Sequence, residues 1–232
     1  MKSHFILFII ALSLTFFNCK NETAEINFDY EYADKEDLIT CENLDTKLYK
    51  EALYTFENDI TKFYDKKTDN TYKAYNSFFK NSIRGNVPYE KIVSPHTMKV
   101  FEALKAENDL WVKKNNTTSL NYNAAIFKCV SNNFLDKNLR TTFNALVSTN
   151  SMTPDLFGAP ILPQISAMSR DKNLTTYMAL DHYYSRLFDI NPSKIITIKD
   201  LEVKKIENLK EVESDPILKK AETEDPHAGH NH

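Results

Sequence analysis

Glycine is scarce in this chain of 232 residues, which contains only Gly85, Gly158 and Gly229. Tight hairpin turns and phosphate-binding loops place glycine at positive φ, because a side chain is strained there. Nucleotide-binding fingerprints need several glycines at close spacing. The scarcity therefore argues against a doubly wound nucleotide-binding fold and against a glycine-turned all-β fold. It favours helices joined by turns of Asn, Asp, Ser and Pro.

The sequence also lacks the short motifs of several enzyme classes. It contains no HExxH zinc site, no CxxC pair, no GxSxG nucleophile turn and no Walker-type loop. We therefore predict no catalytic residues, and an enzyme with dispersed site residues stays the alternative. The chain has a net charge of -3 and so lacks the excess of basic residues that nucleic-acid-binding domains carry. We therefore expect no nucleic-acid partner.

An apolar run follows a basic residue at the N-terminus. Lys2 precedes the run Phe5–Phe17, which is almost entirely apolar. As a helix this run spans about 20 Å, which is too short for the ~30 Å hydrocarbon core of a bilayer. Residues 1–18 are therefore typical of a secretory signal peptide, and an uncleaved anchor is the alternative.

Cys19 stands directly after this apolar run, preceded by Asn18. The arrangement resembles the signal of bacterial lipoproteins, in which such a cysteine is lipidated and becomes the first residue of the mature chain. In that pattern a small residue usually occupies the position of Asn18. The resemblance implies an exported protein anchored by palmitate-bearing lipid to the outer membrane, facing the periplasm or the cell surface, with the membrane and an envelope protein as partners. Ordinary signal-peptide cleavage without lipid is the alternative.

Two further cysteines, Cys41 and Cys129, complete the set. If Cys19 carries lipid, these two are the smallest set that can form a disulfide in an oxidising compartment. We predict a Cys41–Cys129 bridge, which closes a long loop and stabilises the domain by about 2–4 kcal/mol. Two buried free thiols are the alternative.

Apolar residues recur at helical spacing along most of the chain. The strongest stripe lies in Asn43–Asp65, where Tyr49, Leu53 and Phe56 are spaced by three or four and Asn43 is the expected N-cap. Further helices are predicted over Tyr72–Ile83, Ser94–Val112, Leu120–Phe134, Asp136–Val147 and Asp171–Phe188. We therefore predict an all-α fold, with a single bundle or array of about five to seven helices in residues 41–212.

The stretches between these helices carry weaker patterns. Residues 115–119 (NNTTS) are expected to form a loop. Ser148–Gln164 contains three prolines, and we expect a packed loop or the wall of a groove around Phe157–Leu162. Residues 194–212 combine a strand-like and a helix-like pattern.

Both ends of the mature chain are expected to be unfolded. Residues 19–40 are acidic and carry no helical stripe, which predicts a lipidated cysteine followed by a solvated tether. An N-terminal strand is the alternative, since Phe28, Tyr30 and Tyr32 alternate with polar residues. Residues 213–232 are charged and contain prolines, which predicts a disordered tail.

This tail ends in a cluster of histidines, because His227, His230 and His232 lie in the last six residues. Imidazoles at this density beside acidic residues can hold a transition metal ion such as Cu, Zn or Ni. Ordering a flexible tail costs about 1–2 kcal/mol per residue, which weakens such a site. A solvated tail without metal is the alternative.

Two other histidines occur within predicted helices, His96 in a first turn and His182 directly after Asp181. A catalytic role for either needs a nucleophile or a second carboxylate brought in by the fold, and a structural hydrogen-bonded histidine is more common. We interpret the chain as an exported, lipid-anchored helical protein that binds or scaffolds at the cell envelope. Transition-metal binding through the histidine tail is the alternative function.

Overall fold

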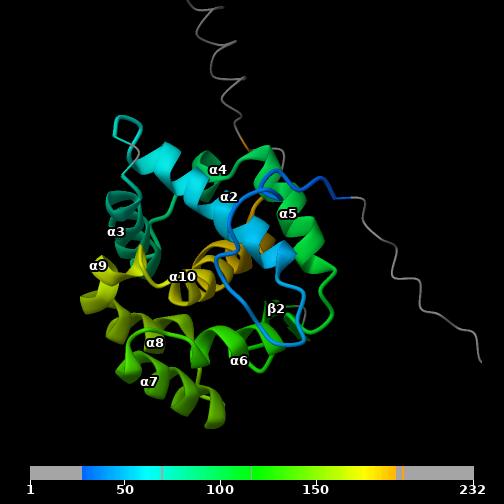
Figure 1. Ribbon diagram of the computed structural model, residues 1–232, viewed down its shortest axis with the longest axis vertical. Helices are drawn as coiled ribbons and strands as arrows, with labels where there is room; N and C mark the ends of the chain where they lie inside the picture. The colour runs from blue at the N-terminus through cyan, green and yellow to red at the C-terminus, as the bar shows by residue number, and fades with distance from the viewer. Residues whose placement is uncertain (1–27, 69, 116, 192–194, 196–232) are drawn as a thin grey trace, which may run out of the picture.

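A computed structural model describes residues 28–68, 70–115, 117–191 and 195. This part of the chain is predominantly helical, which confirms the predicted fold class, and it adds one small two-stranded sheet (Figure 1). The α-helices are α2 Lys47–Tyr64, α3 Thr71–Ile83, α4 Tyr89–Ile92, α5 Pro95–Lys105, α6 Ala125–Asn132, α7 Lys137–Ser148, α8 Pro154–Ile161, α9 Ile165–Met168 and α10 Lys172–Met178. The other elements are strands β1 Trp111–Lys114 and β2 Thr117–Leu120, and the helical turns η1 Leu162–Gln164, η2 Ala179–Tyr183 and η3 Tyr184–Asp189.

Helix α2 contacts α3, α5, α10 and η2, and it carries the stripe predicted for it. Leu53, Phe56 and Ile60 are buried on its inner face. The helix begins later than predicted, because Asn43 has a positive φ of 58° and therefore lies outside the helical region. Thr46 occupies the N-cap position in place of Asn43.

The continuous helical run α10–η2–η3 lies at the centre of the fold, shown in gold in Figure 1. It starts as predicted, since the side chain of Asp171 accepts a hydrogen bond from the backbone N–H of Leu174 at 3.0 Å. Residues 174–184 are all buried. The turn η2 is of the π type, which adds one residue to a helical turn and is frequent at functional sites. Asp181 and His182 both lie on this turn.

A β-hairpin replaces the helix end and loop that the sequence predicted. Helix α5 ends at Lys105, so the prediction of helix up to Val112 is wrong, and residues 117–119 belong to a strand rather than a loop. Trp111 folds back onto α5, where its Nε1 donates to the carbonyl of Leu104 at 2.6 Å. Asn115 adopts a positive φ of 48° at the turn, which Asn tolerates better than most residues.

The segment 28–40, which we call the strap, lies against the domain, where the sequence predicted a solvated tether. It runs across the molecule in blue in Figure 1 and forms neither helix nor strand. Ile39 is 4% exposed, and Phe28 packs against the core. The tether prediction is therefore wrong for residues 28–40, and residues 19–27 lie outside the described part of the chain. The domain includes residues 28–40, which precede the predicted boundary at residue 41.

The proline-containing segment 148–164 forms helix α8 and turn η1, which favours the packed alternative over an irregular groove wall. Thr153 caps α8 by accepting a hydrogen bond from the backbone N–H of Leu156 at 3.2 Å. Phe157 and Ile161 are fully buried in the core. The predicted regions 194 and 196–212 lie outside the residues that the structure describes.

Candidate functional site

The predicted disulfide is present. Cys41 and Cys129 are bonded, with their Cα atoms 5.7 Å apart. The bond joins the end of the strap to helix α6, and Cys129 is half-buried rather than part of the core. Two elements that are 88 residues apart in sequence are therefore held together covalently.

The other predicted site residues, Cys19, His227, His230 and His232, lie outside the described residues, so lipidation and metal binding stay predictions. Across residues 28–191, apart from the gaps named above, no group of three or more His, Cys, Asp and Glu side chains is arranged to hold a metal ion. In the same part of the chain, no helix is long and apolar enough to cross a membrane.

His182 is a buried structural histidine rather than part of a catalytic triad. It is 2% exposed, and burial lowers its pKa. Its Nδ1 lies 3.2 Å from the hydroxyl of Ser82. Its Nε2 has no hydrogen-bond partner within the described part of the chain, and the carboxylate of Asp181 lies 4.0 Å away, too far for a hydrogen bond. The ring is sealed in the core, where no substrate can reach it.

Asp181 belongs to a buried network that extends toward the surface. Its carboxylate accepts hydrogen bonds from the hydroxyls of Tyr122, at 2.8 Å, and Tyr177, at 2.5 Å. Burial and the Asp181 carboxylate raise the pKa of Tyr122 far above its usual value, so this phenol stays protonated. Tyr122 in turn forms part of a surface pocket.

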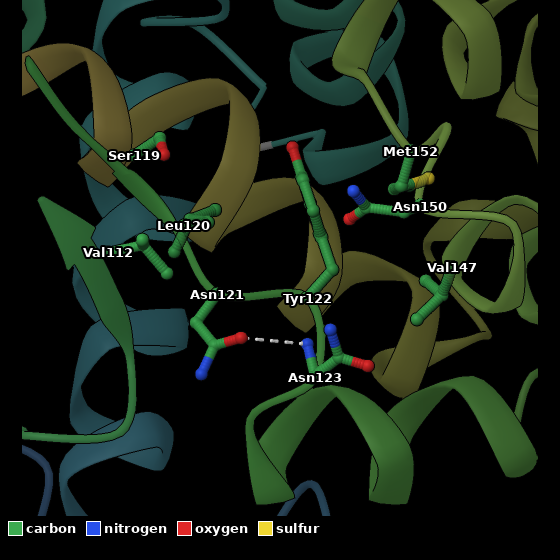
Figure 2. A pocket seen from close by; sticks show the side chains of 9 residues that line it. All are labelled: Val112, Ser119, Leu120, Asn121, Tyr122, Asn123, Val147, Asn150 and Met152. Atoms are coloured by element: carbon green, nitrogen blue, oxygen red, sulfur yellow. Dashed lines mark hydrogen bonds between the residues drawn. The ribbon is translucent and has the colours of Figure 1, made fainter. Parts of the chain in front are cut away.

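This pocket has a cavity volume of about 240 Å³ and lies between the hairpin and helix α7 (Figure 2). Figure 2 shows Tyr122 near its centre, flanked by residues from the hairpin and from the end of α7. The lining residues come from three stretches of chain: Val112, Ser119 and Leu120 from the hairpin, Asn121, Tyr122 and Asn123 from the turn after it, and Val147, Asn150 and Met152 from α7 and the chain beyond.

The polar groups of the pocket fall into two sets. The side chain of Asn121 already forms hydrogen bonds within the protein. Its Oδ1 accepts from the backbone N–H of Asn123 at 3.1 Å, and its Nδ2 donates to the carbonyl of Asp109 at 2.9 Å. The side chains of Ser119, Asn123 and Asn150 have no hydrogen-bond partner among the described residues. These three groups are therefore available to a ligand, and none of the described residues that line the pocket is charged.

Asn150 reaches the pocket because helix α7 ends in a left-handed residue. Its φ is 53°, its N–H donates to the carbonyl of Val147, and the N–H of Ser151 donates to the carbonyl of Leu146. This pattern is a Schellman motif with Asn at the position that glycine usually takes. The motif reverses the chain direction after α7.

Sequence reasoning missed this pocket. Its only signal is the density of asparagines between Asn115 and Asn123, which was interpreted as a loop and a helix start. The pocket needs Asn150 and Met152, which are far away in sequence and whose position depends on the packing of α7.

His96 anchors the strap. Its Nε2 lies 2.7 Å from the carboxylate of Glu51, and its Nδ1 lies 3.0 Å from the carboxylate of Glu31 in the strap. This confirms a hydrogen-bonded structural role for the residue.

No known protein family, curated protein or solved structure matches this chain, so its function is inferred from its own residues.

Proposed function

We propose that this chain is an exported, lipid-anchored protein of the cell envelope whose helical domain binds a small, uncharged, hydroxyl-rich ligand about the size of one sugar ring. The observation that carries the ligand class is the pocket between the hairpin and α7, where the free polar groups of Ser119, Asn123 and Asn150 meet an uncharged lining. No catalytic or nucleic-acid-binding role is proposed.

The lining argues for a neutral ligand. A charged ligand would lose part of its hydration at this site, and none of the described lining residues carries a charge to offset that loss. Amide side chains carry both donors and acceptors, so Asn123 and Asn150 can donate a hydrogen bond to a ligand hydroxyl or accept one from it. Val112, Val147 and Met152 offer apolar surface to the C–H faces of such a ligand. The volume lies just below the range of about 300–1,000 Å³ for drug-sized ligands, which argues for a single small ring.

Ligand-observed NMR on the full chain tests this proposal with three probes that share one ring: a neutral hexose, its uronic acid and its amino sugar. We expect the neutral hexose to bind more tightly than either charged probe, because a charge at this site loses part of its hydration and meets no charged partner among the described lining residues. Equal binding of the three probes, or no binding of the hexose, contradicts the proposal.

Asn150→Asp places a charge in the pocket without a change of shape, and Asp tolerates the positive φ of this position almost as well as Asn. We expect this variant to weaken hexose binding severalfold, because the amide donor of Asn150 is lost and the new carboxylate must give up part of its hydration when the ligand binds. Asn108→Asp is the matched control, because Asn108 is exposed and does not line the pocket. The same loss in both variants would remove the assignment of the site.

Anchoring through Cys19 rests on the position of this cysteine directly after the apolar run. Metabolic labelling with palmitate in a bacterial host is expected to mark the wild type and to be lost in Cys19→Ser. Unchanged labelling in the variant contradicts the anchor.

A second candidate function is transition-metal binding by the C-terminal tail, favoured by His227, His230 and His232 in the last six residues. Titration of Cu²⁺ or Zn²⁺ into the full chain and into a chain ending at Asp225 separates the two cases. Equal binding by both chains contradicts a metal site in the tail.

A further inference from the structure

Helix α2 holds the strap mainly through the strap's backbone. The Nζ of Lys50 donates to the carbonyls of Ala33 and Lys35 at 3.0 and 2.9 Å. The hydroxyl of Tyr54 donates to the carbonyl of Glu36 at 3.1 Å. These bonds depend on the turned main chain of the strap, in which the N–H of Lys35 donates to the carbonyl of Tyr32 at 3.1 Å, and not on the identity of the strap residues.

Glu51 binds N–H groups of the strap, whereas Lys50 and Tyr54 bind its carbonyl groups. Its side chain is fully buried, and its carboxylate accepts hydrogen bonds from the consecutive N–H groups of Glu31 and Tyr32, at 2.7 and 3.0 Å. His96, on α5, lies against the same carboxylate. A buried carboxylate is costly unless donors surround it, so this site needs a peptide N–H pair in place.

Side chains select the chemistry of the bound segment. The Glu31 carboxylate contacts the Nδ1 of His96 at 3.0 Å. The ring of Tyr32 stacks on Tyr54 at a centroid distance of 5.4 Å, and Phe28 stacks on His96 at 5.8 Å. The preferred segment therefore has an acidic residue next to aromatic residues.

The strap is held loosely compared with the helices. Only Ile39 of its residues is buried, and the strap forms no regular secondary structure. Segments with few buried apolar groups open at a small fraction of the global free energy of unfolding. The disulfide at Cys41 keeps the end of an opened strap next to α6, so the strap can return to its place.

We propose that Lys50, Glu51, Tyr54 and His96 form a peptide-binding groove, which the strap fills in cis and which an acidic–aromatic segment of a partner protein that adopts the same turn fills when it displaces the strap. Recognition through main-chain hydrogen bonds, with a few side-chain contacts for selectivity, is an established way to bind peptide segments. Because the strap is tethered, its effective concentration reaches the millimolar range, and the free peptide binds the wild type weakly.

Fluorescence anisotropy with a labelled peptide of residues 28–37 (FDYEYADKED) tests the groove. The receptor is the full chain carrying Glu31→Gln and Tyr32→Ala, which weaken the strap and leave all four groove residues intact. We expect this opened chain to bind the peptide at least about tenfold more tightly than the wild type does, since the competing strap is weakened. A peptide with Lys in place of Glu31, whose carboxylate contacts His96, is expected to bind this chain more weakly.

Groove variants of the opened chain complete the test. We expect Glu51→Gln to abolish binding and Tyr54→Phe, which removes one hydrogen bond at a half-exposed position, to weaken it severalfold. Glu102→Gln is the matched control, because Glu102 is exposed on α5 and pairs only with Lys105 among the described residues. Circular dichroism verifies that each variant is folded. If the Glu51→Gln variant is unfolded, the Tyr54→Phe variant alone decides the outcome.

Three results overturn the proposal: equal peptide binding by the wild type and the opened chain, no binding by either, or binding that Glu51→Gln and Tyr54→Phe leave unchanged. Formation of a concentration-dependent dimer by the opened chain without peptide binding also overturns it, because the groove then belongs to a second copy of this chain.

Discussion

At the scale of single residues, buried ionisable groups give the structure its clearest chemical signatures. His182 is surrounded by the core, with Ser82 at one ring nitrogen and, among the residues that the structure describes, no partner at the other. Burial lowers its pKa, while the nearby Asp181 opposes this effect. The folded protein therefore takes up a proton at His182 less readily than the unfolded chain does.

We expect His182 to destabilise the fold in acid. A histidine in the unfolded chain is protonated below about pH 6.5, whereas the buried ring resists protonation until a lower pH. The neutral ring therefore contributes its whole stabilisation to the free energy of unfolding above pH 6.5. This stabilisation is lost as the pH falls through the pKa of His182 in the folded protein. Urea unfolding between pH 7.5 and 5 should show a shallower loss of stability in His182→Gln than in the wild type. The same slope in both contradicts this assignment.

Asp59 presents the opposite case. Burial raises its pKa, and hydrogen bonds from Thr97, Tyr183 and the N–H of Ser94 to one carboxylate oxygen counter this effect. We expect Asp59→Ala to lower the free energy of unfolding by about 3 kcal/mol, because it leaves these donors without an acceptor. Asp59→Asn keeps an acceptor oxygen and should cost less than half as much, as measured by urea unfolding. Equal costs would show that volume, and not hydrogen bonding, dominates at this position.

At the scale of secondary-structure elements, two glycines make a matched pair. Gly85 has a positive φ of 68° after α3, with open space around it, so a substitution is penalised only by the backbone. Gly158 lies inside α8, and an added Cβ would meet Ile83 of α3 at an ordinary 3.5 Å. We expect Gly85→Ala to destabilise the fold by about 1 kcal/mol and Gly158→Ala to stabilise it by about 0.5–1 kcal/mol. Thermal unfolding measures both, and the same sign for both contradicts the argument.

The Cys41–Cys129 disulfide joins the chain after the strap to helix α6. Its loss in Cys41→Ser/Cys129→Ser should lower the free energy of unfolding by about 2–4 kcal/mol, because the unfolded chain regains the freedom of a long loop. Wild type unfolded in the presence of reductant is the control and should match the double variant. A difference between these two would show that the serines themselves disturb the joint between the strap and α6.

The elements also show how far sequence patterns reach. The predicted bounds of α3, α7 and the run α10–η2–η3 are correct within a few residues, because each has a capping residue followed by an apolar stripe: Asn70, Asp136 and Asp171 accept hydrogen bonds at the N-termini. The hairpin was missed because Trp111 and Val112 continue the helical stripe of α5. Only the contact of Trp111 with Leu104 reveals that the chain has already turned back.

At the scale of the whole molecule, the missed features are those that join distant segments. The pocket needs both the hairpin and the chain beyond α7, and the strap needs Glu51 and His96 from two helices. An acidic stretch such as residues 28–40 gives no sign in sequence that a buried carboxylate will accept its backbone N–H groups.

We also expect the strap to open at a smaller free energy than the helices. Native-state hydrogen exchange should show that the amides of Glu31 and Tyr32 open at a much smaller free energy than the amides of α2, because the strap buries few apolar side chains. Protection factors that match those of Phe56 and Ile60 would show that the strap opens only with global unfolding.

The disulfide also determines how a pulling force passes through the protein. Tension applied at the N-terminus runs along the strap to Cys41 and then crosses directly to Cys129. The chain between these cysteines, with α2 to α5 and the hairpin, forms a covalent loop that the force bypasses. The strap is therefore the part that yields first on the N-terminal side, and once released it extends to at most about 45 Å. The domain can then lie up to that distance from the far end of the strap while the pocket keeps its shape.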